Sequence, residues 1–182
     1  LTTCYAMAEN VFAVSQSVVG EAPTLDTAPP DGREARLSNG KPIANVLVKI
    51  VDPDGALLPE NTIGEIALQS DCMLTGYFHR PDLTDKAMRD GWYLTGDMGY
   101  LKNGEVYITG RKKDIIIVGG KNVYPQDLEL LASEVAGVHP GRVVAFGVMD
   151  TQAGTEEIVV VAESDIQDED EQQNVADSVR AH

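Results

Sequence analysis

Asp97 and Arg111 are charged residues whose settings suit chemistry. Asp97 stands in "YLTGDMG" between Gly96 and Gly99, where we expect a turn that leaves open backbone around the carboxylate. A carboxylate in such a place can accept hydrogen bonds from the two vicinal hydroxyls of a ribose. Arg111 follows across a predicted hairpin, and its planar guanidinium can bind phosphate through two parallel bonds. Considered locally, a turn-forming aspartate and a surface cation beside two lysines stay open as alternatives.

Tyr5 and Glu9 frame the pentapeptide "YAMAE" near the start of the sequence. The carboxylate of Glu9 is an oxygen ligand of the kind that Mg²⁺ prefers, and the ring of Tyr5 offers a stacking face. Taken by itself, this short pattern is too common to define a site.

"GGKN", Gly119 to Asn122, invites comparison with a phosphate-binding Walker loop. That loop needs an earlier glycine and a Ser or Thr after the lysine, and those places hold Ile115 and Asn122. The comparison therefore fails.

The cysteines and histidines form no catalytic or metal pattern. Cys4 and Cys72 are too few for a disulfide framework, so we expect reduced thiols in a cytoplasmic protein. The histidines lack the spacing of zinc ligands, and they are His79, His139 and His182.

The formal net charge of -15 disfavours a nucleic-acid partner, because an acidic surface repels phosphate. From Glu156 to His182, nine acidic residues stand against Arg180 alone, and the carboxylates around Asp168 favour a solvated helix start. We expect no leader and no membrane span, since no apolar run approaches about 20 residues.

The first part of the sequence is typical of antiparallel β structure. Apolar, β-forming segments between residues 45 and 68 predict two strands around a "PDG" turn. Asn103 and Gly104 predict a tight hairpin, because both residues tolerate positive φ. The proline-rich segment 23–32 is expected to be an extended connection without an element of its own.

After residues 111–114 the pattern changes to mixed helices and strands. A helix is predicted from Pro125, which suits the first helical position, to Gly137, which can end it. "RVVAFGV" and "EIVVVAES" predict two strands, and a further helix follows them. A short helix that Asp82 or Thr84 can cap is expected earlier, in the β-rich part. The pattern predicts an α+β fold with a domain boundary at residues 111–114.

"CYAMAE" and "YLTGDMGYLKNGEVYITGRKKDIIIVGGKNVYPQDLE" resemble, in order and spacing, the adenylate-forming superfamily: acyl-CoA synthetases, fatty-acyl-AMP ligases and the adenylation domains of nonribosomal peptide synthetases. The resemblance covers nearly the whole chain. It implies the antiparallel, β-barrel-like closing part of a large N-terminal domain at residues 1–112, followed by an incomplete small mobile α+β domain at 113–182. Because both ends stand inside predicted elements, we expect a fragment that is inactive alone.

The resemblance implies a nucleotide site in the first of these domains. Tyr5 and Ala6 would lie against the adenine of ATP, and Glu9 would bind Mg²⁺. Asp97 would hold the ribose hydroxyls, while Arg111 would contact the ribose and phosphate side. Ala6 replaces the glycine usual in the family, so the backbone beside the adenine is expected to be more restricted.

The resemblance also implies roles in the second domain. Lys113 would be the hinge about which this domain rotates between the two half-reactions. Gly119 and Gly120 would form a loop that approaches a pantetheine arm. Ile117 replaces a lysine common in peptide synthetases and many CoA ligases, which favours the fatty-acyl-AMP ligase branch.

The reaction that the resemblance implies joins two anions, so the enzyme must neutralise phosphate charge and align the reactants. It is the ATP- and Mg²⁺-dependent activation of a carboxylic acid, in particular a fatty acid, to acyl-AMP and pyrophosphate. The acyl group would then pass to the thiol of CoA or of a phosphopantetheine carrier protein. A peptide-synthetase adenylation domain and a non-catalytic binding relative are the alternatives. The adenylation lysine of the family has no counterpart in this sequence.

Overall fold

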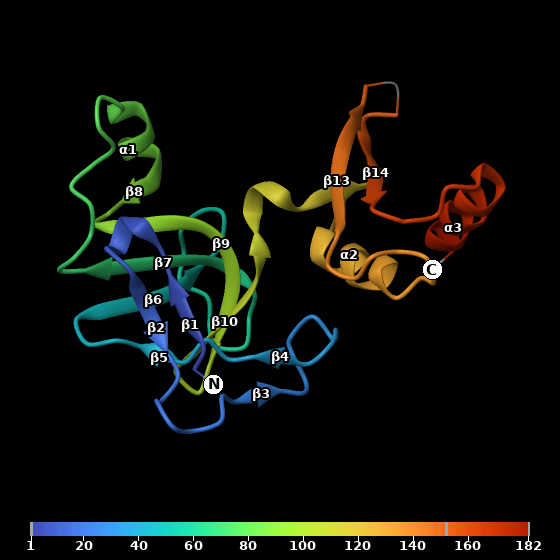
Figure 1. Ribbon diagram of the computed structural model, residues 1–182. Helices are drawn as coiled ribbons and strands as arrows, with labels where there is room; N and C mark the ends of the chain where they lie inside the picture. The colour runs from blue at the N-terminus through green and yellow to red at the C-terminus, as the bar shows by residue number, and fades with distance from the viewer. Residues whose placement is uncertain (1, 152, 182) are drawn as a thin grey trace. The chain divides into compact units, whose positions relative to one another are not determined.

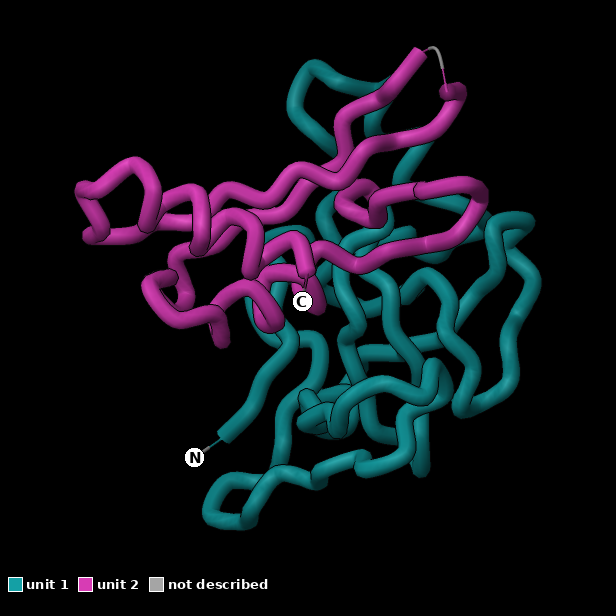
Figure 2. Tube along the Cα trace, turned by 90° about the vertical axis from the view of Figure 1, so that its right-hand side faces the viewer, with its two compact units in different colours: residues 1–112 teal, residues 113–182 magenta. Residues whose placement is uncertain are grey.

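The computed structural model describes residues 2–151 and 153–181 (Figure 1). The chain divides into two compact units, unit 1 at residues 1–112 and unit 2 at residues 113–182 (Figure 2). Predictions that concern Leu1 and His182 lie outside the described residues. Within the described ranges, no helix combines the length and apolar character needed to cross a bilayer.

A curled antiparallel sheet forms the centre of unit 1 (Figure 1). Its strand order is β10-β9-β7-β6, and the short strand β8 pairs with β9. The bounds are Val46–Val51 for β6, Gly64–Ser70 for β7, Met88–Arg89 for β8, Trp92–Lys102 for β9 and Glu105–Arg111 for β10. Register shifts interrupt the pairing of β9 with both β7 and β10, and such bulges increase the local bend and twist of a sheet. The strands predicted around the "PDG" turn are confirmed as β6 and β7.

A second small sheet, β1-β2-β5, packs its apolar side chains into the same core. Its strands are Cys4–Ala6, Ala13–Gln16 and Lys41–Pro42, with the 3-10 turn η1 at Ala8–Asn10 between the first two. The buried core residues of unit 1 come from both sheets: Tyr5, Val14, Val46, Ile50, Ile66, Leu68, Tyr93 and Val106. The core therefore joins the first residues of the chain to strand β9, far along the sequence.

The segment 23–32 does contain an element, so the prediction of a bare connection is wrong. Strand β3 (Leu25–Asp26) pairs with β4 (Arg36–Leu37). Asp26 is only 5% exposed and accepts hydrogen bonds from the Tyr100 hydroxyl and the Lys102 ammonium, each at 2.7 Å. A buried carboxylate with two donors fixes this segment, which has little apolar content to fix it otherwise.

The hairpin between β9 and β10 is confirmed, with Asn103 at φ 55° and Gly104 at φ 75°. The Glu60 carboxylate accepts hydrogen bonds from both backbone N–H groups of the turn, at 3.1 and 3.0 Å. The positive φ of both residues is the reason that this dipeptide joins strands tightly.

Helix α1 (Pro81–Ala87) begins without a side-chain cap, so the prediction that Asp82 or Thr84 caps it is wrong. The N-cap residue is Arg80, whose guanidinium donates hydrogen bonds of 2.9 and 2.7 Å to the carboxylate of Asp82. Thr84 instead accepts a hydrogen bond from the backbone N–H of Tyr77 at 2.9 Å. Asp82 and Thr84 thus lie inside the first turn, because Pro81 already occupies the first helical position.

The described residues of unit 2 form two hairpins and two helices. Their bounds are Ile116–Val118 (β11), Lys121–Val123 (β12), Pro125–Ser133 (α2), Val143–Asp150 (β13), Thr155–Ala162 (β14) and Glu169–Ala181 (α3), after the 3-10 turn η2 at Lys112–Asp114. The two strands predicted after α2 are confirmed as β13 and β14, and they pair with each other along their whole length. Helix α2 starts at Pro125 as predicted but ends at Ser133, before Gly137. The solvated helix start is confirmed, since Asp168 accepts hydrogen bonds from the N–H groups of Asp170 and Glu171.

Candidate functional site

Asp97 lies inside strand β9 rather than at the turn that its flanking glycines suggested. Gly96 has a φ of 73°, and the strand continues through this residue as a bulge. The expected turn is wrong because glycine at positive φ lets a strand bulge without reversing its direction. Asp97 keeps its place in the ladder directly opposite Arg111 of β10.

The carboxylate of Asp97 is held from two sides. The hydroxyl of Tyr5 donates a hydrogen bond of 2.6 Å to Oδ2, and Nε of Arg111 lies 3.2 Å from Oδ1. The side chain of Asp97 is 12% exposed, whereas that of Arg111 is 59% exposed. Residues from the start of the chain, from β9 and from β10 therefore meet at one carboxylate.

Two residues without an assignment from the sequence fix the backbone around Asp97. The buried Glu65 accepts a hydrogen bond from the N–H of Gly96 at 3.1 Å and another from the Lys112 ammonium at 2.7 Å. The hydroxyl of Thr95 accepts from the N–H of Asp97 at 3.0 Å and donates to a β7 carbonyl at 2.8 Å. Thr95 stands in the same "LTGD" segment as Asp97, but Glu65 carries no sequence signal, because only the sheet brings it there.

This group retains the capacity to bind hydroxyls. An ionised carboxylate offers about four lone-pair positions, and Tyr5 and Arg111 take one on each oxygen of Asp97. Burial and the hydrogen bond to Asp97 raise the pKa of Tyr5, so its hydroxyl stays a donor at neutral pH. The exposed guanidinium of Arg111 is free to approach an anion. These residues fit the ribose and phosphate of a nucleotide.

Tyr5 and Ala6 are neighbours in strand β1, but their environments differ. The ring of Tyr5 is 8% exposed and packs in the core cluster, so its hydroxyl is the part that reaches the site. Ala6 is exposed where the pairing of β1 with β2 shifts register. Their roles toward adenine stay predictions.

Glu9 lies in the 3-10 turn η1 and forms a second polar group with two tyrosines. The hydroxyl of Tyr77 donates to Glu9 Oε1 at 3.1 Å and lies 2.8 Å from the hydroxyl of Tyr93. Burial, the contact with Tyr77 and the charge of Glu9 raise the pKa of Tyr93. No cluster of three metal-ligating side chains occurs within residues 2–151 and 153–181. One glutamate suits Mg²⁺, which keeps several waters and binds substrate phosphates beside one or two carboxylates.

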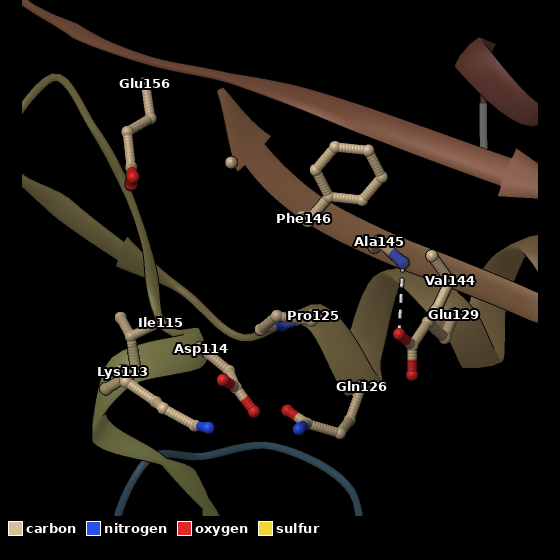
Figure 3. A pocket seen from close by; sticks show the side chains of 11 residues that line it. Lys113, Asp114, Ile115, Pro125, Gln126, Glu129, Val144, Ala145, Phe146 and Glu156 are labelled. Carbon is tan, nitrogen blue, oxygen red and sulfur yellow. Dashed lines mark hydrogen bonds between the residues drawn. The ribbon is translucent and has the colours of Figure 1, made fainter. Parts of the chain in front are cut away.

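Lys113 and the Gly119-Gly120 pair belong to unit 2. Lys113 lines a cavity of about 300 Å³ whose polar lining includes Asp114, Gln126 and Glu129 and whose apolar lining includes Phe146 (Figure 3). In Figure 3 the ends of the Lys113, Asp114 and Gln126 side chains point into the same space, and Glu129 accepts a hydrogen bond from the N–H of Ala145 at 3.0 Å. The structure of this unit leaves the hinge role of Lys113 a prediction.

Gly119 and Gly120 form the tip of the β11–β12 hairpin. Both have positive φ, 55° and 78°, and the space where a side chain would stand is open at each. The N–H of Gly119 donates to the hydroxyl of Thr155 at 2.7 Å, and that hydroxyl donates to the carbonyl of Ile117 at 3.0 Å. The tip is therefore exposed backbone, and its role toward a pantetheine arm stays a prediction.

Comparison with known proteins places this arrangement in a family. Residues 1–78 match the model of AMP-binding enzymes. A relative from Bacillus subtilis (strain 168), "Putative acyl--CoA ligase YdaB", is 42% identical over 129 residues, which are 69% of this chain and 26% of the relative. The 4-hydroxyphenylalkanoate adenylyltransferase of Mycobacterium tuberculosis is 36% identical over 154 residues, 72% of this chain and 24% of the relative.

Solved structures agree over the whole chain. A structure from a study of fatty acyl-adenylate ligases from E. coli and L. pneumophila matches 99% of this chain and 35% of its own, with 28% identity and a TM-score of 0.84. The structure of McyG A-PCP complexed with phenylalanyl-adenylate matches 100% of this chain and 28% of its own, with 29% identity and a TM-score of 0.82. The chain belongs to the adenylate-forming superfamily of AMP-binding enzymes. It spans about a third or less of the length of these relatives.

Proposed function

We propose that this chain is the C-terminal part of an acid–thiol ligase that forms acyl-AMP and pyrophosphate from a carboxylic acid and ATP. Unit 1 would be the closing part of the large adenylating domain, and unit 2 an incomplete small mobile domain. The observation that carries the proposal is the position of Asp97, whose carboxylate is fixed by Tyr5 on one oxygen and Arg111 on the other.

Each residue of the group has a distinct task in this proposal. Asp97 accepts hydrogen bonds from the vicinal ribose hydroxyls, and Arg111 approaches the phosphate side. Tyr5 keeps the Asp97 carboxylate in one orientation, and Glu9 holds Mg²⁺. When bound, Mg²⁺ and ATP supply charge neutralisation and the α-phosphate to which the acid is joined. A mobile nucleotide would lose the alignment that this reaction needs, so a fixed Asp97 contributes directly to rate.

The acid that we propose is a fatty acid, and the acceptor is the thiol of CoA or of a phosphopantetheine carrier protein. Ile117 in place of lysine supports the fatty-acyl-AMP ligase branch, and a structural neighbour is described as a fatty acyl-adenylate ligase. Gly119 and Gly120 would leave room for the pantetheine arm. Lys113 would be the hinge whose rotation brings this glycine loop to the arm. The free thiols of Cys4 and Cys72 support a reducing, cytoplasmic setting.

A peptide-synthetase adenylation domain is the second candidate. The neighbour McyG A-PCP is complexed with an aminoacyl adenylate, and its match to this chain is as good as that of the fatty acyl-adenylate ligases. An amino acid as substrate would assign the chain to this class.

Pyrophosphate exchange by the full-length protein that contains these residues tests the proposal. The panel comprises saturated fatty acids of increasing length, 4-hydroxyphenylalkanoates and amino acids, each with ATP and Mg²⁺. We expect exchange with a fatty acid, and then transfer to CoA or to a phosphopantetheinylated carrier offered separately. If none of these acids yields acyl-AMP, the chain comes from a binding relative and the ligase proposal is wrong.

A further inference from the structure

Tyr77 is joined to the candidate metal ligand Glu9 by a direct hydrogen bond of 3.1 Å. We propose that Tyr77, supported by Tyr93, is a positioning residue that orients the Glu9 carboxylate for Mg²⁺. This inference rests on the proposed function, because it assigns the tyrosines to the same site. Tyr77 lies outside the motifs quoted above, and Tyr93 begins "YLTGDMG" without a role of its own predicted from the sequence.

The hydrogen-bond inventory limits the directions in which these hydroxyls donate. A phenol has one proton to donate, and ionised Glu9 can only accept. Tyr77 therefore donates to Glu9, and Tyr93, whose oxygen lies 2.8 Å from that of Tyr77, can donate to Tyr77 or to Glu9, with which it also interacts. A bond from Tyr93 to Tyr77 polarises the next one, so the buried Tyr93 strengthens the donor that reaches Glu9.

Hydrogen bonds also fix the backbone at Tyr77 and just before it. The N–H of Leu74 donates to the carbonyl of Glu9 at 2.8 Å, and the N–H of Tyr77 donates to Thr84 in helix α1 at 2.9 Å. Gly76 allows this approach, because a Cβ there would meet Thr84 at 3.2 Å. The hydroxyl of Tyr77 is thus delivered to Glu9 by an anchored loop and not by a free side chain.

The arrangement leaves Glu9 able to bind a cation. Tyr77 engages Oε1, and a carboxylate has about four lone-pair positions in total. The segments that hold Glu9 and Tyr93 also hold Tyr5 and Asp97, four residues away in each case. A metal on Glu9 would therefore be supported by the same two segments as the candidate ribose contact. Partners that orient a metal ligand typically change metal affinity by about 10–100-fold.

The affinity of the protein for Mn²⁺ in the presence of ATP can be measured without turnover. The relaxation rate of water protons is the signal, because it changes when Mn²⁺ binds to the protein. In the full-length protein we expect Tyr77→Phe to weaken Mn²⁺ affinity about tenfold, at the low end of that range because Glu9 is one ligand among several. Tyr93→Phe, which leaves Tyr77 in place, should weaken it about threefold. Tyr107→Phe is the matched control, since its hydroxyl bonds only weakly to Glu105, at 3.4 Å, and it should change nothing.

A double variant separates positioning from general damage. In a Glu9→Gln background, Tyr77→Phe should have no further effect on Mn²⁺ affinity, because the group through which Tyr77 acts is already lost. An unchanged affinity in Tyr77→Phe, or an effect that persists in the Glu9→Gln background, overturns the inference. If Tyr77→Phe does not fold, the Mn²⁺ affinity of Tyr93→Phe, alone and in the Glu9→Gln background, tests the inference by the same two criteria. Failure of the wild type to bind Mn²⁺ with ATP would instead count against the proposed function.

Discussion

Asp97 in unit 1 and Gly119 in unit 2 are both fixed by hydrogen bonds to side chains, but their surroundings differ. The side chain of Asp97 is 12% exposed and stands on a strand whose neighbours form the buried core. Gly119 is exposed, and Ile117 beside it is 51% exposed. One group is held by a sheet, and the other by the hydroxyl of Thr155 at the start of β14.

The apolar residues of the two units show the same difference. The long strands of unit 1 supply most of a buried core, with Leu47 of β6 as an exposed exception. By contrast, several apolar side chains of β13 and β14 are exposed: Val144, Phe146, Val148, Met149, Ile158 and Val161. Elements with few buried contacts open at lower free energy than core strands. The rigid sheet of unit 1 suits the Asp97 site, whose contact to a nucleotide needs a fixed distance. The less buried unit 2 suits the Gly119-Gly120 loop, which we propose adapts to a pantetheine arm.

The largest effect is expected from Asp97→Ala, which removes the fixed carboxylate. The Michaelis constant for ATP in pyrophosphate exchange should rise about 100-fold, because two hydrogen bonds to a charged group are lost. Asp97→Asn, of the same size, should show most of this increase. The control is Asp54→Ala, at an exposed turn of unit 1. Unchanged use of ATP by either Asp97 variant would refute the ribose assignment.

Gly99→Ala and Gly147→Ala compare the rigidity of the two units directly. A Cβ at Gly99 would lie 2.3 Å from the backbone oxygen of Tyr107, whereas at Gly147 it would lie 2.8 Å from the end of the Glu156 side chain and 2.9 Å from a methyl group of Ile116. A side chain can move aside, but a backbone in a sheet cannot without breaking its ladder. We expect losses of about 3 kcal/mol for Gly99→Ala and about 1 kcal/mol for Gly147→Ala.

Chemical unfolding of the 182-residue chain measures both losses, with the fluorescence of its one tryptophan, Trp92, as the signal from unit 1. Far-ultraviolet circular dichroism, which includes helices α2 and α3, follows unit 2. Equal losses for the two variants would contradict the difference in rigidity.

Thr155→Val tests the weaker anchoring of the glycine loop. The substitution keeps the shape of the side chain but removes the hydroxyl that joins the N–H of Gly119 to the carbonyl of Ile117. In the full-length protein, acyl transfer to the thiol should slow about tenfold, since two neutral hydrogen bonds are lost, while acyl-AMP formation is unchanged. Thr151→Val, on the exposed turn between β13 and β14, is the control. Loss of both half-reactions together would assign Thr155 to folding and not to the loop.

The sequence could predict the parts of this comparison that depend on local patterns. The Asn103-Gly104 hairpin follows from residues that tolerate positive φ, and the start of α2 at Pro125 follows from the fixed φ of proline. The existence of strands β13 and β14 follows from their β-branched residues. The hairpin at Asn103 and Gly104 also predicts that Arg111 lies near Asp97, because a tight turn brings the two strands into register.

What the sequence could not predict depends on residues far apart in the chain. Glu65 reaches Gly96 only because β7 pairs with β9, and Tyr77 reaches Glu9 only because the loop before α1 folds back to η1. Asp97 was expected in a turn, since glycine on either side suits a bulge as well as a turn and only the pairing decides. Polar contacts between residues far apart in the chain produce no repeating pattern in the sequence from which they could be predicted.

The smallest effect concerns Asp26, the buried carboxylate that anchors β3 in unit 1. Burial raises its pKa, but hydrogen bonds from Lys102, Tyr100 and the N–H of Ala28 outweigh this and leave the pKa below the ordinary 3.8. A carboxyl with a lowered folded pKa contributes stability that is fully present above its unfolded pKa and is lost as the pH falls through the folded pKa. Asp26→Asn should therefore lower the melting temperature of unit 1 by about 4 °C at pH 7, the shift for about 1 kcal/mol in a domain near 100 residues.

The difference from wild type should shrink as the pH falls from 3.8 toward the lowered pKa of folded Asp26, because wild-type Asp26 is also neutral below that folded pKa. Trp92 fluorescence reports the melting of unit 1. Asp177→Asn in unit 2 is the control, because the Asp177 side chain is 61% exposed and its ion pair with Arg180 is open to water, where such pairs add little. A melting difference for Asp26→Asn that stays constant with pH would show that the charge of Asp26 does not anchor β3.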